Sequence, residues 1–166
     1  MAYFPLFVDL TKKKILIAGG GNIAERRMRT ILPFAGQVTV VSGSFTEGIR
    51  TLAEKNGSSA AKIILLKRHF EEADLENADL VLACTSDDEQ NRTITGLCRG
   101  KGIPANNCSD KEDCDFFFPG LIYRDPFVVG FTASGKGHGQ VREIRERTEK
   151  IIDDIMKNDD KGENRV

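Results

Sequence analysis

A short apolar segment that runs directly into a glycine turn constrains the fold of this chain most strongly. Residues 14–18 read Lys-Ile-Leu-Ile-Ala, which is typical of a buried strand, and Gly19-Gly20-Gly21 and a helix start follow. In this order Gly19 permits a tight turn, Gly21 lets the backbone approach a pyrophosphate, and Ala24 lets the helix pack on the strand. The first N–H groups of such a helix face outward toward an anion. The segment therefore predicts a dinucleotide phosphate site.

Charge and length exclude several other classes of protein. The chain has 166 residues, enough for one domain or for one domain with a small appendage. Its formal net charge is −1, with basic and acidic residues interspersed, so no overall field favours nucleic acid or a membrane surface. No apolar run approaches the ~20 residues of a membrane span, and residues 1–5 lack the pattern of a signal peptide. We expect a cytoplasmic protein.

The four cysteines do not have the spacing of a metal site. Cys84, Cys98, Cys108 and Cys114 form no C-x-x-C pair, and the chain has only two histidines. A structural zinc site is therefore not expected, and we assign no metal ligands. Reduced, mostly buried thiols are the expectation for a cytosolic protein. Cys108 and Cys114 flank a candidate catalytic segment, so redox sensitivity stays open for these two.

The first two thirds of the chain alternate apolar runs with helical patterns. This alternation predicts an α/β fold, a Rossmann-like parallel sheet with helices on both faces. The expected strands are residues 14–18, 37–41, 63–66, 80–83 and 103–107. The expected helices are residues 23–32, 45–55 and 87–99, while 69–77 is either a short helix or a loop. Thr46 is a candidate N-cap of the second helix, and Asn56-Gly57 is a candidate stop signal.

The pattern changes after Asp110. Strands at 121–123 and 127–132 are joined by a tight turn and must therefore be antiparallel. A charged helix over 140–156 has apolar residues at helical spacing, so one face packs. We expect three parts: a cofactor-binding domain at 1–110, a small α+β extension at 111–157, and a disordered tail at 158–166. The three phenylalanines before Pro119 either complete the core or form a subunit interface.

Several separated motifs occur in an order that resembles one family. They are Phe4-Pro5-Leu6-Phe7, the segment from Gly19 to Arg27, Cys84-Thr85-Ser86-Asp87-Asp88, Asn107-Cys108-Ser109-Asp110, Phe118-Pro119 and Ala133-Ser134-Gly135. This series covers nearly the whole chain and is similar to the precorrin-2 dehydrogenases, including the dehydrogenase part of siroheme synthase. Motifs in register along the chain are more specific than the glycine turn alone.

The resemblance implies that NAD⁺ takes a hydride from precorrin-2, a tetrapyrrole rich in carboxylates, to give sirohydrochlorin. The cofactor would lie where the loops after strands one, two and four converge. The implied cofactor-binding residues are Gly19, Gly21, Asn22, Ile23, Ala24, Ser42, Gly43, Ser44, Thr85, Ser86 and Asp87. The loop after strand two lacks the acidic residue of the general fingerprint, which leaves the choice between NAD⁺ and NADP⁺ open. Asp87 has an alternative role as a helix cap.

Oxidation of the macrocycle also releases a proton, so a base is expected near the substrate. The resemblance implies that Asp110 is this base or a carboxylate that orients a metal, and the alternative is a turn or helix-cap residue. Substrate carboxylates need local cations and donors, for which the candidates are Asn107, Arg124, Ser134, Lys136 and Arg142. The alternative for Arg142 is a solvated helix face on which it pairs with a glutamate.

Three further expectations concern partners and other functions. The C-terminal extension is expected to form a homodimer, and a separate uroporphyrinogen methyltransferase is a possible partner. Chelation of iron or cobalt stays open. The alternatives to a dehydrogenase are a non-enzymatic NAD-sensing regulatory module and a tetrapyrrole carrier or chelatase partner. Binding of cofactor without turnover would favour these alternatives.

Overall fold

The computed structural model describes residues 3–55 and 61–162 and divides the chain into two units. One unit is Val8–Phe117, and the other joins Met1–Phe7 to Phe118–Val166. The division follows Phe117, whereas the sequence pattern placed it after Asp110. The predicted stop signal at Asn56-Gly57 lies outside the described residues. Within the described chain, no helix is both long and apolar enough to cross a membrane.

The larger unit contains a five-stranded parallel sheet in the order β3-β2-β1-β4-β5. Its strands are β1 (Lys14–Ala18), β2 (Gln37–Val41), β3 (Lys62–Leu66), β4 (Leu80–Ala83) and β5 (Ala105–Asn107). The register pairs Ile15 with both Val38 and Leu80, so β1 is the central strand. The order reverses on either side of β1, and the connections that follow β1 and β4 leave to opposite faces of the sheet, which opens a crevice at its carboxyl edge.

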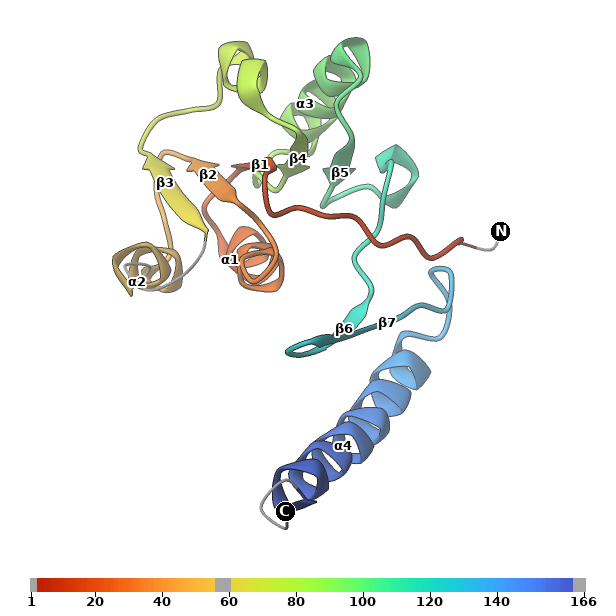
Figure 1. Ribbon diagram of the computed structural model, residues 1–166. Helices are drawn as coiled ribbons and strands as arrows, with labels where there is room; N and C mark the ends of the chain where they lie inside the picture. The colour runs from red at the N-terminus through yellow and green to blue at the C-terminus, as the bar shows by residue number, and fades with distance from the viewer. Residues whose placement is uncertain (1–2, 56–60, 163–166) are drawn as a thin grey trace. The chain divides into compact units, whose positions relative to one another are not determined.

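Helices cover both faces of this sheet (Figure 1). The helices are α1 (Asn22–Ile31), α2 (Glu47–Lys55) and α3 (Asp88–Lys101), and two 3₁₀ segments are η2 (Glu72–Asn77) and η3 (Lys111–Asp113). On one face Leu16 and Ala18 pack with Leu75 of η2 and with Ile94 and Cys98 of α3. Side chains alternate along a strand, so Ile15 and Ile17 point to the other face. The parallel Rossmann-like sheet is as predicted.

The smaller unit contains a hairpin and a long helix. The hairpin strands β6 (Gly120–Arg124) and β7 (Phe127–Phe131) are antiparallel, as predicted from the short turn. The helix α4 (His138–Gly162) packs against β6 within this unit. It continues six residues beyond the predicted end at Met156, so the first part of the expected tail is helical. Residues 163–166 lie outside the described residues.

Candidate functional site

Two glycines at the end of β1 are required by close packing with neighbouring loops. Gly19 has φ +118°, in the left-handed region that favours glycine, and its N–H donates to the Val41 carbonyl over 2.9 Å. A Cβ at Gly19 would overlap the backbone carbonyl of Cys84. A Cβ at Gly20 would overlap the carbonyl of Ser44. These glycines therefore let the ends of β1, β2 and β4 converge.

The third glycine has a different surrounding. Gly21 is the N-cap of α1, and a Cβ built there would meet no atom of the described residues within 4 Å. The first intrahelical hydrogen bond runs from the Glu25 N–H to the Gly21 carbonyl. The amides of Asn22 and Ile23 precede that bond and are left for solvent or a ligand. The missing side chain and the outward amides together fit an approaching phosphate group.

A cavity of about 600 Å³ lies at this edge of the sheet. Its floor is the glycine turn, and its walls are the loops that follow β2 and β4. Of the predicted cofactor-binding residues, the structure places these around the cavity: Gly19, Gly21, Asn22, Ile23, Ser42, Gly43, Ser44, Thr85 and Ser86. The cavity is large enough for part of a dinucleotide, so the residues present fit such a group.

Two of the predicted cofactor-binding residues do not line the cavity: Ala24 packs the helix closely, as the sequence pattern predicts, and Asp87 caps a helix. Ala24 is fully buried on the inner face of α1, where a small side chain allows close packing. Asp87 is the N-cap of α3, and its Oδ1 accepts hydrogen bonds from the N–H groups of Glu89 and Gln90 at 2.9 and 3.1 Å. Neither residue is among those around the cavity. The helix-cap alternative therefore accounts for Asp87.

Other residues around the cavity were not predicted from the sequence. They are Gly20, Val41, Phe45, Thr46, His69, Phe70, Cys84 and Gln90. Gly20 could have been found from the sequence, because it lies in a run of three glycines, and such a run indicates that other groups approach the backbone closely. His69 had none, because it comes from the segment between β3 and η2, whose path depends on tertiary packing.

A buried asparagine connects two of the loops at this edge. Asn91 of α3 is fully buried. Its Oδ1 accepts from the Thr85 N–H at 3.0 Å and from the Thr85 hydroxyl at 2.8 Å. Its Nδ2 donates to the Thr85 carbonyl and to the Ser109 hydroxyl, each at 3.2 Å. Asn91 therefore holds the loops after β4 and β5 together, a role that no sequence pattern indicated.

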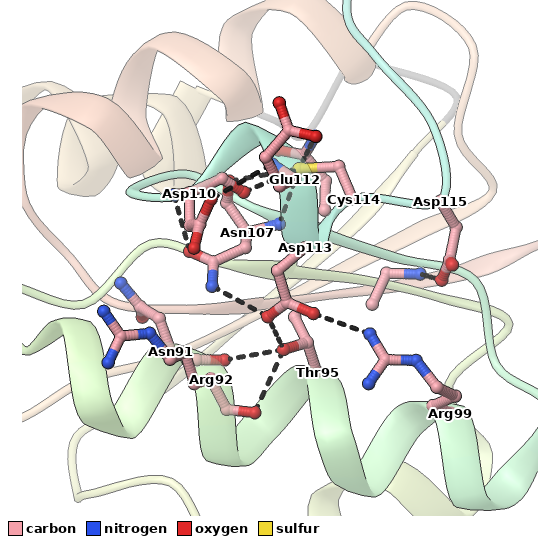
Figure 2. A network of polar contacts seen from close by, with 12 residues as sticks. Asn91, Arg92, Thr95, Arg99, Asn107, Asp110, Glu112, Asp113, Cys114 and Asp115 are labelled. Atoms are coloured by element: carbon pink, nitrogen blue, oxygen red, sulfur yellow. Dashed lines mark hydrogen bonds and ion pairs between the residues drawn. The ribbon is translucent and has the colours of Figure 1, made fainter.

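The candidate base Asp110 is half-buried at the start of η3 (Figure 2). Its Oδ1 accepts a hydrogen bond from the Glu112 N–H at 3.0 Å, which makes Asp110 the N-cap of η3. Its own N–H donates to Oδ1 of Asn107 at 3.2 Å. The Glu112 N–H thus orients the carboxyl group of Asp110, and the Asn107 side chain holds its backbone.

Asn107 was expected to contact substrate, and the structure gives it a different role. Its side chain is only 3% exposed. Its Oδ1 accepts from the Ser109 N–H, the Ser109 hydroxyl and the Asp110 N–H, and its Nδ2 donates to Asp113 over 3.1 Å. The side chain is used within the loop, so Asn107 orders the segment that carries Asp110.

Asp113 anchors this segment to α3, as Figure 2 shows. Its carboxylate accepts hydrogen bonds from the Thr95 hydroxyl, from Arg99 at 2.6 Å and from Asn107. Burial raises the pKa of Asp113, but the hydrogen bonds from Thr95, Asn107 and Arg99 outweigh burial and keep that pKa below its usual value. The charged form therefore holds η3 on α3.

The two arginines proposed for substrate binding are paired with carboxylates of α4. Arg124 donates to Asp153 at 2.8 Å and to Glu149 at 3.0 Å. Arg142 donates to Glu146 at 2.8 Å and is exposed. Both positive charges are neutralised inside the smaller unit, so the structure does not support them as substrate cations. The alternative of a paired helix face is the better description of Arg142.

Ser134 and Lys136 lie in the turn between β7 and α4. Ser134 has φ 52°, unusual for a residue with a side chain, and its hydroxyl accepts from the Tyr3 N–H at 3.0 Å. The N–H of Lys136 donates to the Ala133 carbonyl at 2.9 Å, and Lys136 is exposed. Asp110 belongs to the other unit. These two residues therefore stay substrate candidates on sequence grounds.

Comparison with known proteins supports a dinucleotide site at the cavity. Residues 6–120 match the NAD_binding_7 family, described as "Putative NAD(P)-binding". The chain is 31% identical over 152 residues to siroheme synthases of Ruthia magnifica subsp. Calyptogena magnifica and of Neisseria meningitidis serogroup C. Each alignment covers 92% of this chain and 31% of the relative. The chain thus spans about a third of the length of these relatives, which confirms the resemblance to siroheme synthases over that part.

A solved structure supports the fold. The structure of "SirC, precorrin-2 dehydrogenase" superposes with a TM-score of 0.70 at 20% sequence identity, over 89% of this chain and 70% of that one. The likeness confirms the Rossmann-like arrangement. The match over residues 6–120 contains the glycine turn, the five parallel strands and the cavity at their carboxyl edge. The chain therefore belongs to the NAD_binding_7 family of NAD(P)-binding proteins.

Proposed function

We propose that this protein is an NAD⁺-dependent dehydrogenase that oxidises precorrin-2 to sirohydrochlorin in siroheme or modified tetrapyrrole biosynthesis. The observation that carries the proposal is the cavity lined by the glycine turn of residues 19–21. The similarity of the chain to siroheme synthases, which extends over 92% of its length, supports it. The name of the structural neighbour, a precorrin-2 dehydrogenase, agrees with this reaction. We also propose that the protein works in the cytosol. Its substrate would come from a separate uroporphyrinogen methyltransferase.

The residues around the cavity divide the binding of a dinucleotide among them. The amides of Asn22 and Ile23 at the start of α1 would bind the pyrophosphate, where the helix dipole favours negative charge. Ser42 and Ser44, which follow β2, would offer hydroxyls to a ribose. Thr85, which Asn91 holds in place, would lie on the nicotinamide side. When bound, NAD⁺ supplies the hydride acceptor.

Asp110 is proposed as the base that takes the proton released from the macrocycle. Its position at the N-cap of η3 fixes its carboxyl group, and the Asn107–Asp113 network fixes the loop beneath it. A base held by a backbone donor on a packed loop loses little freedom when substrate binds. Asn107 and Asp113 are positioning residues in this scheme, because they act through Asp110.

Lys136 and the turn around it are proposed to receive substrate carboxylates. Gly135 and Gly137 both have positive φ, of 78° and 62°, which residues with a side chain rarely adopt, so these glycines permit the tight turn that carries Lys136. The exposed Lys136 adds a positive charge at the same turn. Ser134 completes the set, although its hydroxyl also holds the Tyr3 amide.

We also propose that the protein forms a homodimer through α4. Three isoleucines of this helix are more than half exposed: Ile144 at 54%, Ile151 at 59% and Ile155 at 56%. With Thr148 they recur at spacings of four, three and four residues, which is the seam of a paired helix. A second copy of the same chain would cover such a stripe symmetrically.

The test is anaerobic turnover of precorrin-2 with NAD⁺ by the whole chain and by Asp110→Asn. The substitution keeps a hydrogen-bond acceptor for η3 but removes the base, so we expect kcat to fall about a hundredfold or more. NADH affinity should not change. Glu112→Gln is the matched control, because Glu112 is exposed on the same turn and should keep normal turnover.

The outcomes separate the candidate functions. Normal turnover by Asp110→Asn would remove Asp110 from the mechanism but leave the dehydrogenase in place. Binding of NADH without turnover by the unmodified protein would instead favour a sensing module or a tetrapyrrole carrier. Metal insertion is a separate reaction, and a chelation assay with sirohydrochlorin and Fe²⁺ or Co²⁺ tests it independently.

A further inference from the structure

Two of the cysteines are neighbours at the carboxyl ends of β4 and β5. The last paired residues of these parallel strands are Ala83 and Asn107. The next residues along the chain are Cys84 and Cys108, and the Cys108 N–H donates to the Ala83 carbonyl at 2.9 Å. Adjacent strands lie about 4.8 Å apart, which is within the Cα separation that a disulfide spans. The backbone therefore already has the spacing for a cross-link.

The two thiols are in direct contact. The Cys84 and Cys108 Sγ atoms are 2.6 Å apart and form a hydrogen bond. Cys84 is 5% exposed, whereas Cys108 is half-buried and more open to solvent. Cys98 of α3 is fully buried in the core, and the Cys114 thiol donates a hydrogen bond to the Asn107 carbonyl. Only the first pair is thus arranged for a reaction between sulfur atoms, among these four described thiols.

The surroundings favour a thiolate on one member of the pair. The hydrogen bond with Cys84 lowers the pKa of Cys108 to about 7, and the charges of Arg27 and Arg26 lower it further against the effect of burial. The same hydrogen bond and burial raise the pKa of Cys84. At neutral pH Cys108 is therefore the nucleophile and Cys84 the protonated partner.

We propose that Cys84 and Cys108 form a reversible disulfide that couples the cofactor cavity to oxidants of the peroxide class. The Cys108 thiolate attacks a peroxide oxygen, the O–O bond breaks, and a sulfenic acid and water result after uptake of one proton. The Cys84 sulfur then attacks the sulfenic sulfur, the S–O bond breaks, and a second water leaves. Two thiols lose two electrons, and hydrogen peroxide is reduced to two waters.

The cross-link would act on the cavity through Cys84. This residue lies around the cavity, and its carbonyl contacts the glycine turn at Gly19. The next residue, Thr85, also lines the cavity, and its hydroxyl donates a hydrogen bond to Asn91. A bond from Sγ of Cys84 to Sγ of Cys108 fixes a new side-chain geometry at this wall of the cavity. We therefore expect the oxidised protein to bind NADH at least about fivefold more weakly than the reduced protein. This consequence does not depend on the identity of the substrate.

The test uses the whole chain, reduced and then treated with a small excess of hydrogen peroxide. Peptide mass spectrometry without reductant is expected to show a Cys84–Cys108 disulfide that dithiothreitol reverses. NADH titration by fluorescence should show the loss of affinity in the oxidised protein and its return on reduction. Cys114→Ser is the matched control and should still form the disulfide, whereas Cys108→Ser should keep its NADH affinity after peroxide.

Two results would overturn the proposal. One is that Cys84 and Cys108 stay reduced, or that Cys108 pairs with Cys114 instead, which differential alkylation of the unsubstituted protein detects without any variant. The other is that the disulfide forms but NADH affinity is the same in both states, which would remove the link to the cavity. Circular dichroism of each variant shows whether it has folded.

Discussion

At the scale of single residues, the three consecutive glycines have separate tasks. Gly19 and Gly20 have no side chain because backbone carbonyls of neighbouring loops occupy that space. Gly21 has none although the protein itself leaves room for one. The simplest reason for the third glycine is a ligand that comes close to the backbone, as a pyrophosphate does.

This difference predicts that one substitution lowers stability and a similar one lowers cofactor affinity. Gly20→Ala forces a methyl group against the Ser44 carbonyl and should lower the free energy of unfolding by about 1–3 kcal/mol. Gly21→Ala should change it by less than about 0.5 kcal/mol. It should nevertheless weaken NADH binding on the order of tenfold, because the methyl group lies in the path of the phosphates. Urea unfolding and NADH titration measure the two effects, and a stable Gly21→Ala with normal affinity would contradict the assignment.

Several site residues could be predicted from the sequence because parallel strands end at one edge of the sheet. Ser42, Ser44, Thr85 and Ser86 lie around the cavity for this reason, and their contacts with a cofactor stay a prediction. Asn91 could not be found in the same way, because its role depends on how closely α3 approaches two loops. Arg124 was assigned to the substrate, because sequence alone does not show which carboxylates a long side chain meets.

At the scale of elements, the strands were predictable and the irregular segments were not. β1 and β2 have the predicted bounds, because their apolar runs are continuous and end at turn residues. β5 begins at Ala105, two residues later than expected, since Pro104 has no N–H to add to the sheet. The segment 69–77 proved to contain the 3₁₀ turn η2, which has too few residues for a periodic signal.

η2 depends on one ion pair rather than on its own periodicity. Arg68 donates to both carboxylate oxygens of Asp74, at 2.9 and 2.5 Å, and the Glu71 N–H donates to the same carboxylate at 2.9 Å. The hydrogen bonds from Arg68 hold the pKa of Asp74 below its usual value, although burial opposes them. The Asp74 side chain is 6% exposed.

The lowered pKa predicts a pH-dependent stability with a definite sign. The carboxylate stabilises the fold above the unfolded pKa of 3.8 and loses this effect as the pH falls through the lower folded value. Asp74→Asn should therefore lower the free energy of unfolding by about 1–3 kcal/mol near neutral pH and by less in acid. Urea unfolding of both proteins at neutral and at acidic pH measures this difference in the free energy of unfolding. An equal difference at both would show that the charge of Asp74 is not responsible.

At the scale of the whole molecule, the exposed stripe of α4 is the feature that a single chain explains least. The helix has 25 residues, or about 37 Å, and one of its faces packs on β6 within its own unit. Its isoleucines at 144, 151 and 155 lie elsewhere on the surface and are exposed. Their heptad-like spacing suits a second helix better than solvent.

The proposed dimer gives a clear prediction for this stripe. Ile151→Glu places a charge at the centre of the seam and should shift the protein from dimer to monomer in sedimentation velocity, at micromolar concentration. Lys150→Glu is a suitable control, because Lys150 is exposed on the same helix and lies about 100° around the helix axis from Ile151. A monomeric unsubstituted protein would contradict the dimer, and so would an Ile151→Glu variant that sediments unchanged.

Transfer of a hydride from precorrin-2 to a nicotinamide cofactor is the activity on which the proposed roles of these residues depend. The most direct measurement follows sirohydrochlorin and NADH together, under anaerobic conditions, after precorrin-2 and NAD⁺ are added to the reduced protein. We predict that both products rise in parallel and in equimolar amounts, and a second reaction with NADP⁺ reports the cofactor preference. If neither product forms with protein in excess over precorrin-2, while NADH still binds, the chain is not a precorrin-2 dehydrogenase.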